Sequence, residues 1–238
     1  APVYGDSELT IGAAMKRFKG ERSNLVVASK FGDPSPNQRI LPAGSSKADY
    51  IASVERSLER LNLDYLDIVF VHAAGHFDDL EEERRRIFDP NMLAAVEELK
   101  GRGLMRHLAI SSHGPHNMET LMLEAVQSNH FDVIMPAFNF MKFPRLKLVV
   151  AAAEARNIGI VAMKTLAGAK HAGLDFGPGK FEQAAFKWVL GHKEVAGLVI
   201  TISDTDDLDL YLPASGAEIT AADRRILDRY AAAVGTEY

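Results

Sequence analysis

Residues Leu66 to His72 read LDIVFVH, a nearly unbroken apolar run that ends in a single histidine. An apolar run without alternation is typical of a strand covered on both faces, as in parallel sheets flanked by helices. The sequence AAG at residues 73–75 then interrupts the pattern. His72 is therefore expected at the carboxyl end of a buried strand, where α/β barrels and doubly wound sheets carry their chemistry. A histidine there can equally be a core residue with a satisfied hydrogen bond.

Other strand-like runs along the chain also end in reactive or polar residues. The residues at these ends are Lys30, Ser111, Ser112, Asn139, Lys164 and Ser203. Because the carboxyl ends of parallel strands meet at one edge of the sheet, this shared feature favours a common site over a series of unrelated polar residues.

Strand-like and helix-like stretches alternate throughout. The strands are expected at 25–30, 66–72, 107–111, 131–136, 158–163 and 195–202. The helices are expected at 8–19, 46–61, 90–100, 117–127, 144–155, 181–190 and 220–230. Such alternation predicts a parallel sheet with right-handed crossovers. No linker or composition shift divides residues 1–238, so we expect one domain, with six strands where a closed α/β barrel has eight.

Several local patterns sharpen these expectations. Ser46 with Asp49, and Thr220 with Asp223, have the spacing of helix-capping pairs. The stretch at 8–19 is expected to bury an apolar stripe, whereas the charged stretch at 81–86 is expected to be a solvated helical face. The residues of the expected stripe are Leu9, Ile11, Gly12, Ala13, Ala14 and Phe18.

Composition limits the classes of function. With 238 residues and 47% hydrophobic content the chain can bury a full core, and its net charge of −5 offers no basic field for nucleic acid. No apolar stretch reaches the roughly 20 residues that span a bilayer. The absence of cysteine excludes disulfides, thiol catalysis and cysteine-ligated metals within these residues. No signal-like segment follows Ala1, and we expect a cytoplasmic protein.

Three residue types suggest carbonyl chemistry. A tyrosine such as Tyr4 can give a proton to a carbonyl oxygen while a hydride reaches the carbon, and a nearby Lys30 ammonium would lower the phenol pKa from about 10 toward working pH. A neutral imidazole at His72 can orient the carbonyl. Each residue is unspecific alone, since Tyr4 can be an amphipathic surface residue and Lys30 a solvated strand end.

From Ala1 to about Tyr230 the chain resembles the aldo-keto reductase family. The residues YGDSE beginning at Tyr4, the ASK that ends at Lys30, and the segment from Asp64 to His72 are similar to three motifs of that family, in the same order. The resemblance implies a (β/α)8 barrel enzyme that reduces an aldehyde or ketone with NAD(P)H. It also implies that Tyr4 is the general acid, Lys30 the residue that tunes its pKa, and His72 the residue that orients the carbonyl.

The resemblance extends to segments that hold the nicotinamide cofactor. Ser112 stands where the family has an asparagine, and Met163 where it has an aromatic residue that stacks on the nicotinamide ring. The cofactor-binding residues implied in this way are Ser111, Ser112, Asn139, Met163, Lys164, Thr165, Leu166, Gly168 and Ser203. The family usually prefers NADP, which we expect here with NAD as the alternative. The acidic residues Asp204, Asp206 and Asp207 would repel a 2′-phosphate unless they point away.

The family pattern also places an aspartate just upstream of the tyrosine, and a first strand before it. Neither is found within residues 1–238, so the natural protein is expected to extend upstream of Ala1 by several tens of residues. An eight-stranded barrel with six strands in this chain would leave a gap between the strand ending at Lys30 and the strand ending at Ile202.

Alternative functions remain open from the sequence. A barrel of this kind can bind the cofactor as a sensor or subunit without turnover. Lys164 at a strand end can also form a Schiff base, as in barrel aldolases. His113 and His116 form a His-x-x-His with no carboxylate at ligand spacing, so we interpret them as loop residues and expect no metal. The expected partner is a small-molecule carbonyl substrate, with no nucleic acid and no membrane, and the oligomeric state is unknown.

Overall fold

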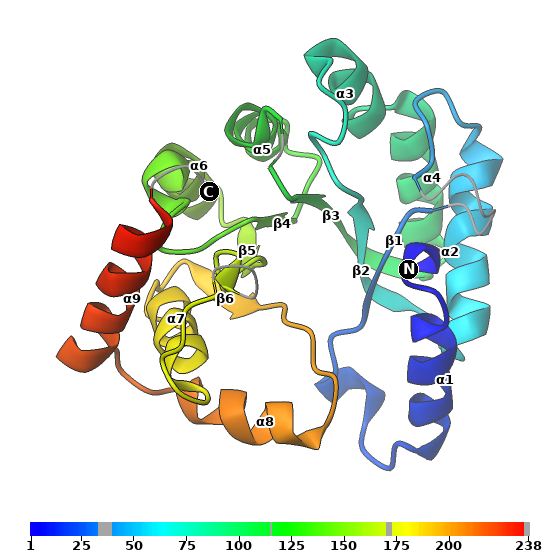
Figure 1. Ribbon diagram of the computed structural model, residues 1–238. Helices are drawn as coiled ribbons and strands as arrows, with labels where there is room; N and C mark the ends of the chain where they lie inside the picture. Colours follow the sequence, from blue (N-terminus) through cyan, green and yellow to red (C-terminus); the bar gives the residue numbers. More distant parts are fainter. Residues whose placement is uncertain (33–39, 115, 170–172, 236–238) are drawn as a thin grey trace. The chain divides into compact units, whose positions relative to one another are not determined.

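The computed structural model describes residues 1–32, 40–114, 116–169 and 173–235 (Figure 1). These residues form two compact units, 1–133 and 134–238. The stretch at 31–45 is rich in Pro, Gly and Asn, which predicts a loop, and it lies partly outside the described residues. In the described ranges no helix is both long enough and apolar enough to cross a membrane.

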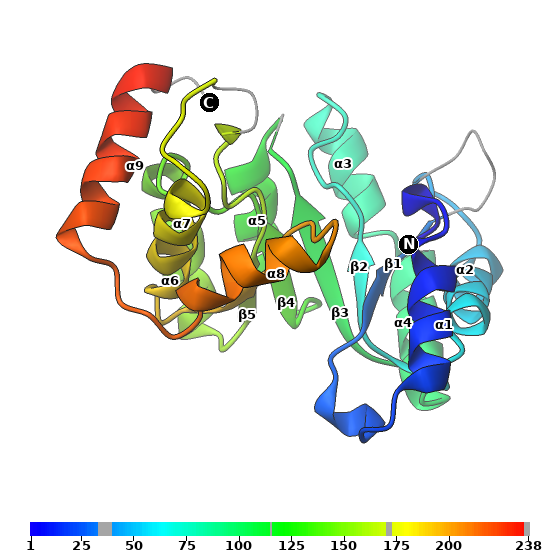
Figure 2. The same cartoon turned by 60° about the horizontal axis from the view of Figure 1, so that its bottom comes forward.

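The first unit contains three parallel strands. Strands β1 (Ala28–Lys30), β2 (Leu66–Val71) and β3 (Met105–Ser112) pair in sequence order, with Lys30 opposite Phe70 and Phe70 opposite Ala109. The α-helices of this unit are α1 (Ser7–Arg17), α2 (Lys47–Leu61), α3 (Leu80–Ile87), α4 (Pro90–Gly101) and α5 (Met118–Gln127). Two short 3-10 helices, η1 (Pro2–Tyr4) and η2 (Arg22–Asn24), precede β1. In both views α1, α2 and α4 lie on one side of the strands (Figures 1 and 2).

The second unit repeats the strand–helix alternation. Its strands β4 (Val133–Pro136), β5 (Gly159–Ala162) and β6 (Val195–Leu198) also follow sequence order, and β5 and β6 pair in parallel. Its helices are α6 (Phe143–Ala155), α7 (Lys180–Leu190), α8 (Thr205–Tyr211) and α9 (Ala221–Val234), with a 3-10 turn η4 (Leu212–Ala214). Parallel pairing and strand–helix alternation agree with the predicted fold class.

The strand that ends at His72 is buried as its apolar composition predicts. Leu66 and Val69 are almost fully buried, and β2 hydrogen-bonds to β1 on one side and β3 on the other. Both predicted capping pairs form reciprocal hydrogen bonds, Ser46 with Asp49 at the start of α2 and Thr220 with Asp223 at the start of α9. The sequence was sufficient to predict these two helix starts because each capping pair is only three residues apart.

Two outer strands are shorter than predicted. Strand β1 begins at Ala28 instead of residue 25, and Val26 is 74% exposed. Strand β6 ends at Leu198 instead of residue 202, and both Val199 and Ile202 are about half exposed. In the described part of the chain β1 pairs only with β2, and β6 only with β5. Strand β5 ends at Ala162, opposite Leu198, so Val199 and Ile202 lie beyond the end of the only strand beside β6 in the described chain.

The stripe predicted for the first helix is wrong. Of the predicted stripe only Gly12 is buried, whereas Leu9, Ile11 and Phe18 are exposed, and Glu8 shares the buried face of α1 with Gly12. A Cβ atom on Gly12 would lie 2.2 Å from the Arg60 carbonyl oxygen, so α1 approaches the end of α2 at van der Waals distance there. Close approach at a glycine, together with a buried carboxylate, replaces the expected apolar contact.

Two further differences concern charged segments. Helix α8 was not predicted; it begins at the acidic run, where the Asp204 carboxylate accepts hydrogen bonds from the N–H groups of Asp206 and Asp207.

The segment at 81–86 does form a helix, but its prediction as a solvated face is wrong. Glu83 and Arg86 of α3 are buried as an ion pair. The pair is buried because it also bonds to the backbone of His72, Ala73 and Phe77, outside α3, and a local charge pattern does not reveal these contacts.

Candidate active site

The first unit brings together the three residues expected to act on a carbonyl. Tyr4 is the last residue of η1, Lys30 the last of β1, and His72 follows β2 directly. The Tyr4 hydroxyl lies 3.4 Å from Nε2 of His72, and the Lys30 ammonium nitrogen lies 4.9 Å from the centre of the Tyr4 ring. Register explains the proximity, because Lys30 pairs with Phe70 on the adjacent strand, two residues before His72.

His72 is held in its neutral form. Its side chain is buried, and burial, with the nearby charges of Lys30 and Arg86, lowers its pKa to about 3. The buried Nδ1 atom has no hydrogen-bond partner among the described residues. An unpaired buried acceptor costs less than an unpaired buried N–H group, so the proton belongs on Nε2, facing Tyr4. His72 can therefore donate a hydrogen bond from Nε2.

The expected effect of Lys30 on Tyr4 is not what the structure gives. Partial burial raises the pKa of the Tyr4 phenol, and the Lys30 ammonium lies over the ring face without a hydrogen bond to the phenol oxygen in the described chain. Burial also lowers the pKa of Lys30, against the opposing effect of Glu8. The physical reason is that burial disfavours the charged form of both groups. Tyr4 is accordingly protonated at neutral pH.

A buried carboxylate next to this trio had no predicted role. Glu8 is 2% exposed; it accepts a hydrogen bond from Ser29 Oγ at 2.6 Å and one from Arg60 Nε at 2.7 Å. Burial by itself would raise the pKa of the Glu8 carboxyl, but the hydrogen bonds from Ser29 and Arg60 lower it overall. Ser29 directly precedes Lys30, so Glu8 ties α1 and α2 to the strand that carries the lysine. The only sequence signal for Glu8 was its place in the YGDSE motif.

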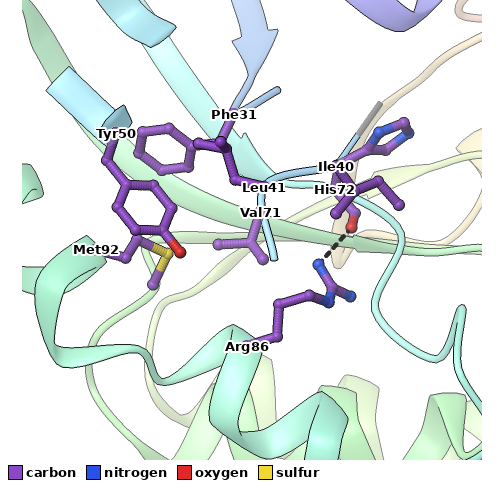
Figure 3. A pocket seen from close by; sticks show the side chains of 8 residues that line it. All are labelled: Phe31, Ile40, Leu41, Tyr50, Val71, His72, Arg86 and Met92. Carbon is purple, nitrogen blue, oxygen red and sulfur yellow. Dashed lines mark hydrogen bonds between the residues drawn. The ribbon is translucent and has the colours of Figure 1, made fainter. Parts of the chain in front are cut away.

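Arg86 is a second residue that the sequence reasoning missed. Its Nη1 donates to the His72 carbonyl at 2.8 Å and its Nη2 to the Ala73 carbonyl at 2.9 Å, as Figure 3 shows for the first of these. In the same view the His72 ring points away from a small, largely apolar cavity, toward which only the backbone of His72 is directed. The residues lining it are Phe31, Ile40, Leu41, Tyr50, Val71, His72, Arg86 and Met92.

Ser111 and Ser112, expected to contact the cofactor, are both fully buried. The Ser111 hydroxyl accepts a hydrogen bond from the Ala73 N–H and donates a long one, 3.4 Å, to the Val71 carbonyl. The Ser112 hydroxyl donates to the Ala74 carbonyl at 2.7 Å. Both hydroxyls therefore bond to the backbone on either side of His72, and their role toward a cofactor stays a prediction.

In the second unit Asn139 joins two of the segments expected to bind the cofactor. Its amide donates to the Lys164 carbonyl at 2.9 Å, and its side-chain oxygen accepts from the N–H groups of Met141 and Lys142. Asn139, Met163 and Thr165 are buried, Leu166 and Gly168 half-buried, and Lys164 exposed. An exposed lysine lacks the desolvated surroundings that activate a Schiff-base nucleophile.

The turn formed by residues 164–168 has an unusual backbone. Lys164, Ala167 and Gly168 all have positive φ values, of 54°, 47° and 78°. Tyr230 of α9 donates a hydrogen bond to the Ala167 carbonyl at 2.7 Å. In the described chain the N–H groups of Thr165, Leu166 and Gly168 donate to no protein acceptor. Clustered free N–H groups in such a turn form a concavity suited to an anion.

Ser203, the remaining predicted cofactor residue, lies at the start of α8. It is exposed, and its N–H donates to the Asp207 carboxylate at 2.7 Å. The carboxylates of Asp204 and Asp207 thus accept hydrogen bonds from the backbone. Among the described residues no group of three or more potential ligands could hold a metal ion, and His116 pairs instead with Asp78 at 3.1 Å.

A model of the aldo/keto reductase family matches residues 1–175. This range includes Tyr4, Lys30 and His72, and it also covers the turn at 164–168.

Two curated relatives and one solved structure illustrate the similarity. L-galactose dehydrogenase from Arabidopsis thaliana is 27% identical over 173 residues, which are 70% of this chain and 50% of that protein. Aldo-keto reductase YhdN from Bacillus subtilis (strain 168) is 28% identical over 144 residues, 60% of this chain and 39% of that protein. The chain thus spans half or less of the length of these relatives.

The solved structure is that of an aldo-keto reductase from Bacillus halodurans in its holo form. It matches with a TM-score of 0.67 over 94% of this chain and 77% of that chain, at 21% identity. This likeness confirms the predicted fold class, an α/β barrel fold of the aldo-keto reductase type, to which the described residues contribute six strands.

Proposed function

This chain belongs to the aldo/keto reductase family, and we propose that the protein reduces an aldehyde or ketone to an alcohol, using NADPH. The observation that carries the proposal is the 3.4 Å contact between the Tyr4 hydroxyl and Nε2 of a neutral, buried His72. Two uncharged donors lie side by side there, and a carbonyl oxygen placed within hydrogen-bond distance of both can accept a hydrogen bond from each.

Each side chain has one task in the proposed reaction. Nε2–H of His72 orients the carbonyl oxygen and polarises its bond to carbon. The Tyr4 hydroxyl then gives its proton to that oxygen as negative charge develops on it. The Lys30 ammonium lies above the Tyr4 ring, and its positive charge offsets part of the cost that burial places on the phenolate left behind. The bound nicotinamide cofactor supplies the hydride.

The second unit fits a dinucleotide chemically. The N–H groups of Thr165, Leu166 and Gly168 have no acceptor among the described residues, and clustered backbone donors of this kind can bind a pyrophosphate without a side-chain charge. The Asn139 amide holds this turn through the Lys164 carbonyl. We propose NADP as the preferred cofactor on the family resemblance. The carboxylates of Asp204 and Asp207 already accept backbone hydrogen bonds, which reduces their repulsion of a 2′-phosphate.

A direct assay tests the function. The purified protein is mixed with NADPH and a panel of aliphatic and aromatic aldehydes and ketones, and both cofactor oxidation and alcohol formation are measured. We expect one alcohol formed for each NADPH oxidised. Binding of NADPH without any carbonyl-dependent oxidation across the panel would contradict the proposal and favour a cofactor-binding protein without turnover.

A further inference from the structure

Arg86 forms two hydrogen bonds to the backbone that directly follows β2. Its guanidinium is 3% exposed and donates from separate nitrogens to the carbonyls of His72 and Ala73, at 2.8 and 2.9 Å (Figure 3). The planar fork of arginine suits two acceptors held side by side, a geometry that a lysine ammonium does not reproduce. Arg86 therefore fixes two successive peptide groups at the residue expected to orient the substrate.

The backbone that Arg86 holds is strained. Ala73 has a φ of 53°, in the left-handed region that residues with a Cβ atom rarely adopt. Ser111 supports it from β3, where its hydroxyl accepts from the Ala73 N–H and its carbonyl accepts from the Ala74 N–H at 2.7 Å. Strained conformations persist only when the surroundings over-determine them, and they concentrate at functional sites. The peptide group that joins His72 to Ala73 is thus held at both ends, by Arg86 at its carbonyl and by Ser111 at its N–H.

Arg86 is itself fixed by a buried carboxylate. Glu83, one turn earlier on α3, is fully buried and forms an ion pair with Arg86 Nη2. The other Glu83 oxygen accepts from the Phe77 N–H at 2.8 Å, in the segment that follows His72. The two residues thus connect α3 to both ends of residues 72–77.

We propose that Arg86 and Glu83 form a clamp that positions His72 for carbonyl reduction, an inference that rests on the proposed function. The clamp touches neither substrate nor cofactor and acts through His72 alone. Its contribution is geometric, because displacing a catalytic group by about 1 Å can cost two orders of magnitude in rate. The charge of Arg86 also contributes, after burial, Lys30 and His113, to the low pKa of His72.

A purely structural ion pair would behave differently. If Glu83 and Arg86 only hold α3 against the unit, their loss lowers stability but leaves the environment of His72 unchanged in molecules that remain folded. A clamp predicts a change at His72 itself. The test therefore needs a readout at the His72 ring in addition to turnover.

The decisive variant is the double substitution Arg86→Met with Glu83→Gln, which removes both charges together and leaves no unpaired buried charge. Arg86→Lys is the conservative variant. Arg84→Met is the matched control, because Arg84 lies on the same helix and pairs with Glu124 without contacting the His72 strand end. Each variant is measured for thermal unfolding and for kcat and KM with 4-nitrobenzaldehyde and NADPH. A pH titration of the His72 ring nitrogens by ¹⁵N NMR completes the set.

We expect the double variant to lose at least tenfold in kcat, with the aldehyde KM changed by less than about threefold. Its His72 nitrogens should shift and titrate at higher pH. Arg86→Lys should fall between the double variant and wild type, and Arg84→Met should match wild type. The other groups that act on His72 are the same in all variants, so the shift reports on the clamp. These groups are Lys30, His113, Tyr4 and the amino group of Ala1.

Unchanged His72 resonances and kcat in a folded double variant would overturn the clamp, as would an equal loss in Arg84→Met. If the double variant does not fold, the His72 titration of Arg86→Lys decides, because that variant keeps a cation beside Glu83. If wild type reduces no carbonyl, the proposed function fails. The His72 titration still decides whether Arg86 and Glu83 position that ring.

Discussion

At the residue scale, burial disfavours the charged forms of both Tyr4 and His72, and it therefore shifts their pKa values in opposite directions. It raises the pKa of the Tyr4 phenol and lowers that of the His72 imidazole, because in each case the charged form is disfavoured. Both groups are consequently uncharged across the neutral range. Burial alone therefore keeps Tyr4 protonated as the acid and His72 neutral as the orienting group, with no carboxylate needed beside either residue.

Tyr4→Phe tests the acid. The substitution removes the hydroxyl and keeps the ring under the Lys30 ammonium, so we expect turnover to fall by about 100-fold or more, the usual scale of general acid catalysis. The NADPH dissociation constant should change little. Tyr65→Phe is the control, because Tyr65 packs against the guanidinium groups of Arg22 and Arg106 instead. Near-normal turnover in Tyr4→Phe would remove Tyr4 from the mechanism.

His72 also predicts a pH dependence of stability. Its pKa is about 3 in the folded protein against 6.5 for an unperturbed histidine, so the unfolded chain binds the extra proton between these values. The free energy of unfolding should therefore fall as pH decreases from about 6.5 toward 3. The slope from this group is at most about 1.4 kcal/mol per pH unit.

Urea unfolding at several pH values measures this slope. His72→Asn should flatten the dependence below pH 6.5, and the same change at the exposed His130 should not. Identical slopes for His72→Asn and wild type would show that His72 is not buried in the neutral form.

At the element scale, the sequence predicted an element correctly where residues close together in the chain determine it, and failed where distant residues do. The strand ending at His72 and the capped starts of α2 and α9 were predicted correctly because apolar runs and capping pairs are local signals. The buried face of α1 was missed because Glu8 is stabilised by Arg60, 52 residues away in the sequence. The burial of Arg86 was missed because its acceptors, the carbonyls of His72 and Ala73, lie outside α3.

The residues of the site show the same division. Tyr4, Lys30 and His72 could be chosen because each stands at a recognisable strand or helix boundary. Glu8 and Arg86 could not, since a charged residue in a helix is ordinarily solvated. The positive φ of Ala73 had no sequence signal either, because alanine gives no indication of a left-handed backbone.

Gly12→Ala tests the contact between α1 and α2. The new Cβ would lie 2.2 Å from the Arg60 carbonyl oxygen, a backbone atom that cannot move aside cheaply. We expect a loss of about 1–3 kcal/mol in the free energy of unfolding, the usual range for overpacking. Gly101→Ala in α4 is the control, where no atom lies within 4 Å and helix propensity favours alanine. Equal stability of the two variants would contradict the close approach of α1 to α2.

At the scale of the whole molecule, two features act in opposite directions on cofactor choice. The family resemblance favours NADP, whereas the acidic run at the start of α8 would repel its 2′-phosphate. We expect NADPH to raise the melting temperature more than NADH at equal concentration, because a ligand stabilises by its concentration relative to its dissociation constant. Asp206→Asn should lower the dissociation constant of NADPH about two- to fivefold, the scale of an exposed charge pair, and leave that of NADH unchanged.

Thermal unfolding with each cofactor measures both effects, with Asp209→Asn, an exposed carboxylate later in α8, as control. Equal melting temperatures with NADPH and NADH would show that the acidic run outweighs the family preference.

Through the hydrogen bond from Tyr230 to the Ala167 carbonyl, helix α9 stabilises a turn 63 residues earlier in the chain. The connection between η4 and α9 exposes Ser215, Gly216 and Glu218, the kind of small and polar surface segment that proteases cut first. A single nick there would free α9 to drift from the turn at 164–168 while the strands stay paired. Partly digested molecules would then look folded by circular dichroism and already be unable to keep that turn in shape.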